Sequence, residues 1–369
     1  MAGNHAFTPA YFCPMNWLRK QLLAPDAASA AAPMRAITVT PQGALSMTQV
    51  AIPSPAADEV VIRVAYAGVN RADLLQRQGS YKVPEGSTPV LGLEVSGTIV
   101  AIGDKVIGWA LGEQVCALLD GGGYSEFVAA PAACVLPIPP KCSLADAASI
   151  PEACATAWLA LVEEGRLRDG QTVLIHGAAG NIGPMMVQIA ALLGARVLAT
   201  TGSRSKAEHL RALGAHPILY TETDFAAEAK RLSEGNGVDV VIDILGAPYL
   251  EAHFGLLNAG GRLVSLAMME GAQAENLAVG RILAKNLHWS GVMLRRLSRT
   301  QKAALIDAVR RRLLPSLATG ALRPQIDHIF PLDQAEKAHA RMQERLHCGK
   351  ILLEVHSPAA AVMPARTGA

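Results

Sequence analysis

A glycine-rich turn between a hydrophobic run and a helical pattern constrains this sequence more than any other feature. Residues 172–176 are Thr-Val-Leu-Ile-His, which is apolar enough for a buried strand, and residues 177–183 are Gly-Ala-Ala-Gly-Asn-Ile-Gly. Small residues let a backbone approach a pyrophosphate, and the helix that follows offers free N–H groups and its positive end to the anion. Pro184 suits a first helical turn, where its missing N–H costs nothing. Glycines at this spacing also occur in ordinary tight turns, so the neighbouring segments must decide.

Those neighbours alternate between short apolar runs and helical patterns. Strand patterns cover residues 195–201, 217–220, 238–245 and 262–268, and helical patterns cover 185–193, 203–213, 225–233 and 249–257. This alternation is typical of an α/β fold with a doubly wound parallel sheet and helices on both faces. We therefore predict a Rossmann domain over residues 155–291. Its cofactor contacts in the turn are predicted to be Ala178, Gly180, Asn181, Ile182 and Gly183.

The end of the second predicted strand indicates which dinucleotide binds. Sites for NAD usually place an Asp or Glu there, to accept from the ribose 2′-hydroxyl. Here the segment offers Ser203, Arg204 and Lys206 and no acid. A carboxylate would repel a 2′-phosphate, whereas Arg204 would bind it as a fork and Lys206 as a point charge. The sequence therefore favours NADPH, with the alternative that both cations lie on a solvated face of the next helix.

Length and composition predict a two-domain enzyme of the cytoplasm. At 369 residues the chain exceeds the usual size of one core, and 51% of its residues are hydrophobic. Its 33 basic and 31 acidic residues create no field suited to nucleic acid or an anionic membrane surface. No uncharged apolar run reaches the roughly 18 residues of a membrane span. Six cysteines without paired spacing indicate reduced thiols of an intracellular protein.

Composition also divides the chain outside the nucleotide domain. Residues 1–33 are predicted to be a disordered extension, or to result from a start codon placed upstream of Met34. Short alternating runs between Pro and Gly residues indicate strands at 60–66, 95–103, 325–330 and 350–355. We therefore predict one β-rich domain formed by residues 34–154 and 292–357, with the nucleotide domain inserted and a flexible tail at 358–369. The cleft between the two domains would hold the nicotinamide.

Five short motifs carry a resemblance to a known family. They are AGVNRADLLQRQGSY at 67–81, LGLEVSG at 91–97, GGGYSEF at 121–127, IPEA at 150–153 and GKI at 349–351. Over residues 34–355 the chain resembles the medium-chain dehydrogenase/reductase superfamily, and within it the zinc-independent quinone oxidoreductases of the p53-inducible type. The resemblance implies a GroES-like catalytic domain, an inserted Rossmann domain and an NADPH:quinone oxidoreductase activity.

The resemblance also allows the family's metal site to be followed residue by residue. In the family's alcohol dehydrogenases a catalytic zinc needs a thiolate and an imidazole, with an open position for the substrate oxygen. The matching places hold Asn70 and Leu93, and neither is a usable zinc ligand. We therefore predict no metal, and hydride transfer from NADPH to an electron-poor acceptor, which is a quinone or an alkene conjugated to a carbonyl.

The resemblance places Asn70 and Tyr81 beside the nicotinamide and the acceptor. The Asn70 amide would orient the reactants, and the Tyr81 phenol would donate a hydrogen bond to the developing oxyanion. Asn70 could instead form an Asx turn, and Tyr81 could be a loop aromatic that covers the domain. Further cofactor contacts implied by the resemblance are Thr156, Tyr220, Leu245, Met268 and Lys350. Leu245 and Met268 could also be ordinary core residues.

Two single residues in this part of the chain call for a separate interpretation. Asn181 stands where the turn of the quinone reductases commonly has glycine, and asparagine tolerates left-handed backbone angles better than most residues. His176 has no partner spacing typical of a triad or a metal pair, so we predict that it is a structural residue or a minor cofactor neighbour, and not a base.

The last strand pattern of the nucleotide domain, residues 287–293, predicts a homodimer, because an exposed final strand tends to find a partner. In the resembled family such edges pair across a two-fold axis. Two other functions stay open. One is an enal or enone double-bond reductase of the same fold, and the other is an NADPH-binding sensor or structural protein with negligible turnover.

Overall fold

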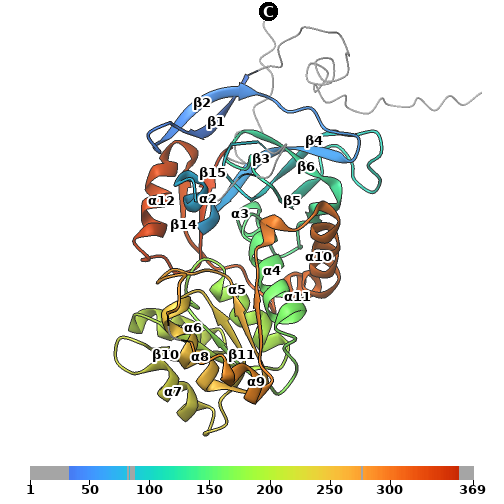
Figure 1. Ribbon diagram of the computed structural model, residues 1–369. Coiled ribbons are helices and arrows are strands. Elements are labelled where there is room, and N and C mark those ends of the chain that lie inside the picture. Colours follow the sequence, from blue (N-terminus) through green and yellow to red (C-terminus); the bar gives the residue numbers. More distant parts are fainter. Residues whose placement is uncertain (1–32, 81–82, 84–87, 276, 357–369) are drawn as a thin grey trace, which may run out of the picture.

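The computed structural model describes residues 33–80, 83, 88–275 and 277–356, which form a β-rich lobe and an α/β lobe (Figure 1). The predicted extension up to residue 32, the tail from residue 358 and the side chain of Tyr81 lie outside these ranges.

The α/β lobe is built around six parallel strands. In order across the sheet they are β10 (His216–Leu219), β9 (Arg196–Thr201), β8 (Thr172–Ile175), β11 (Val238–Asp243), β12 (Leu257–Ser265) and β13 (His288–Gly291). The order reverses between β8 and β11, and ligands of such sheets bind in the crevice at this switch point. Val173, Leu174 and Ile175 of β8 are all buried, because helices cover both faces of the sheet. These helices are α5 (Gly183–Leu192), α6 (Arg204–Ala212), α7 (Phe225–Leu232), η3 (Ala247–Tyr249), α8 (Leu250–Leu256) and α9 (Gly280–Lys285).

The β-rich lobe is a seven-stranded sheet that the two ends of the described chain build together. Its strands run in the order β14 (Ile326–Pro331), β15 (Lys350–Glu354), β3 (Glu59–Val69), β4 (Glu94–Ile102), β5 (Gln114–Leu118) and β7 (Val135–Pro137), with β6 (Phe127–Pro131) also paired to β3. A hairpin of β1 (Pro33–Val39) and β2 (Leu45–Ala51) lies beside it. Because β15 pairs antiparallel with β3, the last strand of the chain returns to the lobe that the first strands begin.

Helices line the junction of the lobes and the outer faces of the β-rich lobe. They are α2 (Arg71–Arg77), η1 (Ala132–Cys134), α3 (Leu144–Ala147), α4 (Pro151–Trp158), η2 (Leu159–Glu164), η4 (Leu294–Arg296), α10 (Arg299–Arg312), α11 (Leu314–Thr319), η5 (Leu332–Gln334) and α12 (Ala335–Gln343). One apolar core runs from Leu118 of β5 through Cys154 of α4 to Val173 of β8, so the two lobes share their packing.

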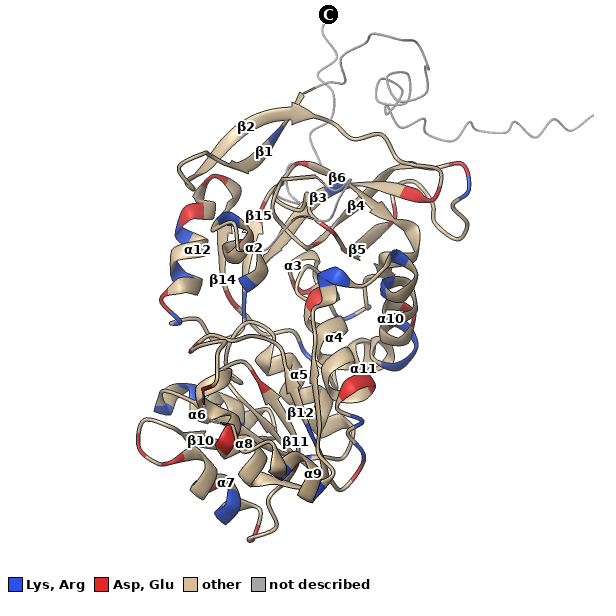
Figure 2. Ribbon diagram, in the orientation of Figure 1, with Lys and Arg blue, Asp and Glu red and all other residues tan. Residues whose placement is uncertain are grey.

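The predicted fold class is confirmed: a β-rich lobe receives an inserted Rossmann lobe with a parallel sheet. Most predicted strands and helices agree with the observed ones within two residues, but the strand predicted at 262–268 begins earlier, as β12 at Leu257. The helices α10, α11 and α12 were not anticipated within the returning segment. Figure 2 shows acidic and basic residues interspersed over both lobes. None of the helices in the described ranges combines the length and apolar character that crossing a bilayer requires.

Candidate active site

The glycine-rich turn connects β8 to α5 at the centre of the parallel sheet. Gly177 has a φ of +59°, in the left-handed region that favours glycine. A Cβ atom at Gly183 would lie 2.1 Å from the carbonyl oxygen of Ala178, so this position tolerates no side chain. The Ala178 N–H donates to the carbonyl oxygen of Thr200 on β9, at 3.1 Å. These constraints form a narrow cradle at the N-terminus of α5, and such a cradle fits a pyrophosphate.

Asn181 extends from this turn to the other lobe. Its Nδ2 donates to Oδ1 of Asn70 at 2.7 Å, and its own Oδ1 is buried without a hydrogen-bond partner in the described part of the chain. Buried acceptors are almost always satisfied, so this oxygen fits a donor from a ligand, such as a ribose hydroxyl. The φ of Asn181 is not in the left-handed region, so the missing family glycine causes no backbone strain.

The three residues predicted to bind a 2′-phosphate all lie at the start of α6. Ser203 caps the helix by accepting from the Lys206 N–H at 3.4 Å. The Lys206 ammonium donates to the carbonyl oxygen of Arg345 at 2.8 Å, and Arg204 is paired with Glu222 at 2.9 Å. Sequence reasoning missed Glu222, because it follows the third strand and not the second.

Three further predicted cofactor contacts follow the carboxyl ends of β10, β11 and β12. The Tyr220 hydroxyl lies 2.5 Å from the place of a Cβ atom on Gly202, so the phenol covers the turn after β9. The Leu245 N–H donates to Asp243 at 2.7 Å, and the sulfur of Met268 lies 2.9 Å from the place of a Cβ atom on Gly246. Met268 is exposed, in contrast to a core residue. The three residues therefore lie at the carboxyl edge of the parallel sheet, where ligands of such sheets bind.

Asn70 ends β3 and precedes α2, where its side chain is buried. Its Nδ2 donates to Glu94 Oε1 at 3.0 Å, and its Oδ1 accepts from the Lys350 ammonium at 2.9 Å as well as from Asn181. Lys350 also forms an ion pair with Glu94, and both side chains are buried. The amide of Asn70 thus joins β4, β15 and the glycine-rich turn. Lys350 was predicted as a cofactor contact, and in the structure its ammonium contacts Asn70 and Glu94.

A second layer of buried polar groups supports Asn70. The Asp73 carboxylate accepts from the N–H of Asn70 at 2.8 Å and from the N–H of Gly92 at 2.9 Å. The Tyr124 hydroxyl lies 3.3 Å from Asp73 and 3.1 Å from Nε2 of His339. Burial raises the pKa of Asp73 to about 6. Sequence reasoning missed this layer, although Asp73 and Tyr124 stand in the motifs that carry the resemblance.

The helix α4 brings two more residues to this region. The N–H of Glu152 donates to Glu94 Oε2 at 3.0 Å, and Thr156, a predicted nicotinamide contact, follows one turn later. Burial, together with the charge of Glu94, raises the pKa of Glu152 to about 8.

His176, predicted to be a structural residue or a minor cofactor neighbour, is buried directly after β8. Its Nε2 lies 3.0 Å from Nε2 of His253, and its Nδ1 lies 3.1 Å from the Thr200 hydroxyl. Burial lowers the pKa of His176, which therefore stays neutral. Both ring nitrogens of His176 thus contact protein groups, which are His253 and Thr200.

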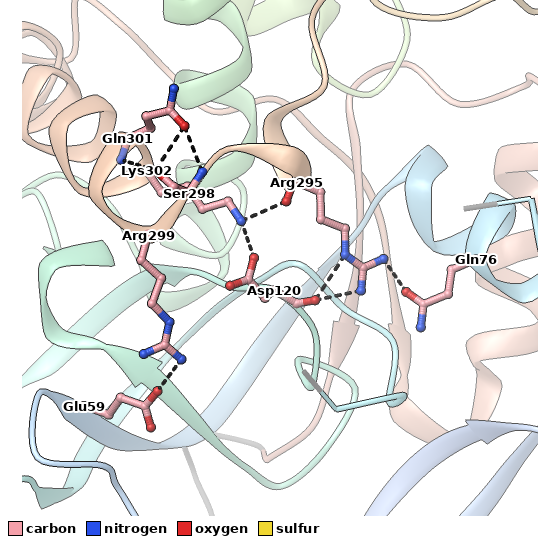
Figure 3. A network of polar contacts seen from close by, with 8 residues as sticks. All are labelled: Glu59, Gln76, Asp120, Arg295, Ser298, Arg299, Gln301 and Lys302. Atoms are coloured by element: carbon pink, nitrogen blue, oxygen red, sulfur yellow. Dashed lines mark hydrogen bonds and ion pairs between the residues drawn. The ribbon is translucent and has the colours of Figure 1, made fainter. Parts of the chain in front are cut away.

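A polar network fixes the segment after β13 to the β-rich lobe (Figure 3). The Arg295 guanidinium donates to the carbonyl oxygen of Asp120 at 2.7 Å and to Gln76 of α2 at 2.5 Å. Lys302 of α10 pairs with the Asp120 carboxylate, and Arg299 pairs with Glu59 at 3.0 Å. The network holds α2, the helix that begins beside Asn70, against the exit from the Rossmann lobe.

Two family models match this chain, one in each lobe. Residues 56–140 match the alcohol dehydrogenase GroES-like domain, and residues 181–310 match the zinc-binding dehydrogenase family. No group of three or more His, Cys, Asp or Glu side chains in the described ranges is arranged to hold a metal ion.

Curated relatives cover most of the chain. It is 34% identical over 85% of its length to a phenolphthiocerol/phthiocerol polyketide synthase protein of Mycobacterium tuberculosis, but it spans only 14% of that protein. It is 31% identical to the human synaptic vesicle membrane protein VAT-1 homolog, over 82% of this chain and 80% of the relative.

Solved structures of similar proteins share the fold. The CurK enoyl reductase has a TM-score of 0.77 at 28% identity, covering 87% of this chain and 99% of that chain. The Escherichia coli quinone oxidoreductase, solved with NADPH, has a TM-score of 0.77 at 25% identity, covering 88% and 99%. Both lobes, the motifs and these relatives agree: the chain belongs to the medium-chain dehydrogenase/reductase superfamily of nicotinamide-dependent oxidoreductases.

Proposed function

We propose that this protein is an NADPH:quinone oxidoreductase of the p53-inducible type that works without zinc. The hydrogen bonding of Asn70 carries the proposal. Its amide oxygen has two lone pairs, and Lys350 and Asn181 occupy both, so none is left for a metal. Leu93, at the other matching place, has no lone pair. A quinone is already electron-poor and needs no Lewis acid to accept hydride.

Bound NADPH would supply the hydride, and the chain's own residues would position the reactants. The cradle at Gly183 and the buried Oδ1 of Asn181 fit the dinucleotide, and Thr156 is the proposed contact on the side of the nicotinamide. Tyr81 is the proposed hydrogen-bond donor to the acceptor. Asn70, with its amide committed to Glu94, Lys350 and Asn181, would orient these groups by holding the two lobes in register.

The preference for NADPH rests on Ser203, Arg204 and Lys206 at the start of α6. These groups favour a 2′-phosphate, whereas Glu222 draws Arg204 away from it. The E. coli quinone oxidoreductase of the same fold was solved with NADPH, which agrees with this preference.

A second candidate function is reduction of a carbon–carbon double bond conjugated to a carbonyl. It is favoured by the similarity to the CurK enoyl reductase, since the same crevice serves either electron-poor acceptor. A third is NADPH binding with negligible turnover, in a sensor or structural protein.

We also propose a homodimer in the cytoplasm, formed through β13. This strand ends the six-stranded sheet, and its Trp289 is 44% exposed. An exposed strand edge with apolar neighbours favours pairing with a second copy.

The test is to measure oxidation of NADPH and NADH by the purified full chain with 1,2- and 1,4-quinones and a 2-alkenal. We expect faster oxidation of NADPH, quinones as the best acceptors, and rates that a metal chelator leaves unchanged. Gly183→Val is the matched control that should not bind the cofactor, because the valine side chain would clash with the Ala178 carbonyl and close the cradle. A better rate with the alkenal would favour the second function, and binding without turnover would favour the third.

A further inference from the structure

Glu152 carries a half-buried carboxyl group for which the described residues offer no hydrogen-bonding partner. It stands at the start of α4, where its backbone N–H is held by Glu94. Its carboxyl oxygens make no hydrogen bond or ion pair with any residue in the described ranges, and they are not sealed from solvent either. Carboxylates placed beneath a surface are normally paired, so an unpaired one at a crevice calls for an explanation.

The charged groups around Glu152 come from four elements and leave it protonated. Glu94 of β4 and Asp73 of α2 repel a negative charge there. Lys350 of β15 attracts one, but its ammonium is bound to Glu94 and Asn70, and Lys302 of α10 is bound to Asp120. Burial is the largest influence, and the pKa of Glu152 rises to about 8. At neutral pH the group is therefore an acid with an O–H to donate.

Its position places this acid beside the proposed reaction centre. Glu152 and Thr156 are four residues apart on α4, so they share one face of the helix. The Glu94 carboxylate that accepts from the Glu152 N–H also accepts from the Asn70 amide. Glu152 thus lies on the helix face of Thr156, the proposed nicotinamide contact, and its backbone is one hydrogen bond away from the Glu94–Asn70 junction.

We propose that Glu152 is the proton donor of the reduction, an inference that rests on the proposed reductase function. The acceptor gains two electrons with the hydride that the reduced dinucleotide supplies. The O–H bond of Glu152 then breaks as a new O–H bond forms on the acceptor oxygen, and the carboxylate left behind regains a proton from water. An unperturbed phenol such as that of Tyr81 has a pKa of about 10, farther from neutral pH than the pKa of Glu152. Glu152 is therefore the better-matched acid.

The decisive variant is Glu152→Gln, which keeps the size of the side chain and removes the proton. We expect single-turnover reduction of a quinone to slow about 10²-fold or more, while NADPH binds with unchanged affinity in a fluorescence titration. The wild-type rate should fall as pH rises through about 8, with a solvent deuterium isotope effect, and the variant should show neither. Glu113→Gln, an exposed carboxyl of the same lobe, is the control expected to match the wild type.

A second measurement does not depend on turnover. Infrared difference spectra of the protein without cofactor should show one carboxyl that stays protonated at neutral pH and is lost in Glu152→Gln. Glu152→Asp should keep this signal and part of the rate. An unchanged rate and pH profile in Glu152→Gln would overturn the proposal, and so would the absence of that infrared signal. A wild type that fails to oxidise NADPH with any of the acceptors would instead refute the reductase function.

Discussion

The choice between NADPH and NADH depends on a few charged residues at the start of α6. Lys206 reaches the Arg345 carbonyl, and Arg204 shares its guanidinium with Glu222. Removing Lys206 takes away a cation that the 2′-phosphate would bind, while removing the charge of Glu222 frees Arg204. The two changes should therefore shift cofactor selectivity in opposite directions.

We expect Lys206→Ala to raise KM for NADPH about tenfold or more and KM for NADH less than about twofold, since a hydrogen bond to a charged group contributes about 1.5–3 kcal/mol. Glu222→Gln should lower KM for NADPH by a few-fold, in line with the weakness of exposed ion pairs. Steady-state kinetics with both dinucleotides check this, with the exposed Lys105→Ala as control. Equal changes for NADPH and NADH would mean that neither residue reads the phosphate.

Between elements, the contact of Asn181 with Asn70 joins the cofactor turn to the start of α2. The two residues are far apart in sequence and belong to different lobes, so this bond opposes their separation. Because Asn181 has no left-handed backbone angle, alanine can replace it without strain.

A double-mutant cycle of Asn181→Ala and Asn70→Ala measures that bond. We expect a coupling free energy of about 0.5–1.5 kcal/mol in denaturant unfolding, as for a typical hydrogen bond within a protein. The pair Thr38 and Thr48, whose hydroxyls meet 3.3 Å apart in the β1–β2 hairpin, gives a comparison cycle within one lobe. A coupling near zero between the two asparagines would show that they do not hold the lobes together.

Local patterns explain why the strands and helices of the Rossmann lobe were predictable. The apolar run of β8, the glycines that end it and the helix cap at Ser203 before α6 are all patterns among residues close in sequence. The bonds of Asn70 to Glu94, Asn181 and Lys350 could not be predicted in this way, because they join residues that no periodicity links. The motifs named these residues, but only the fold shows that they contact one another.

At the scale of the whole molecule, one shared apolar core packs the two lobes against each other. This core runs from β5 through α4 to β8. Glu152 and Thr156 belong to α4, so the packing of that helix fixes their positions. Reaction groups on a packed helix keep their geometry better than groups on loops. The proposed site would therefore be held on one side by the packed core, and on the other by Asn70 and the network around Arg295.

The far edge of the Rossmann lobe has a different character, because apolar side chains there face solvent. Leu283 of α9 is 88% exposed, Val279 is 62% exposed and Trp289 of β13 is 44% exposed. Single exposed apolar residues are ordinary, but three of them at β13, the edge strand of the described sheet, and at the neighbouring α9 are typical of an interface. Pairing of two copies through β13 would cover all three.

This arrangement predicts the outcome of placing a charge at that edge. Leu283→Glu should convert a dimer into a monomer in sedimentation at micromolar concentration, because two carboxylates would be desolvated across a two-fold axis. Ile107→Glu is the matched control, since Ile107 is 92% exposed but lies in the β4–β5 loop of the other lobe. Both variants should stay folded with circular-dichroism spectra like that of the wild type, because neither side chain is part of a core. A wild type that sediments as a monomer would rule out the dimer, and an Ile107→Glu variant that dissociates equally would place the interface elsewhere.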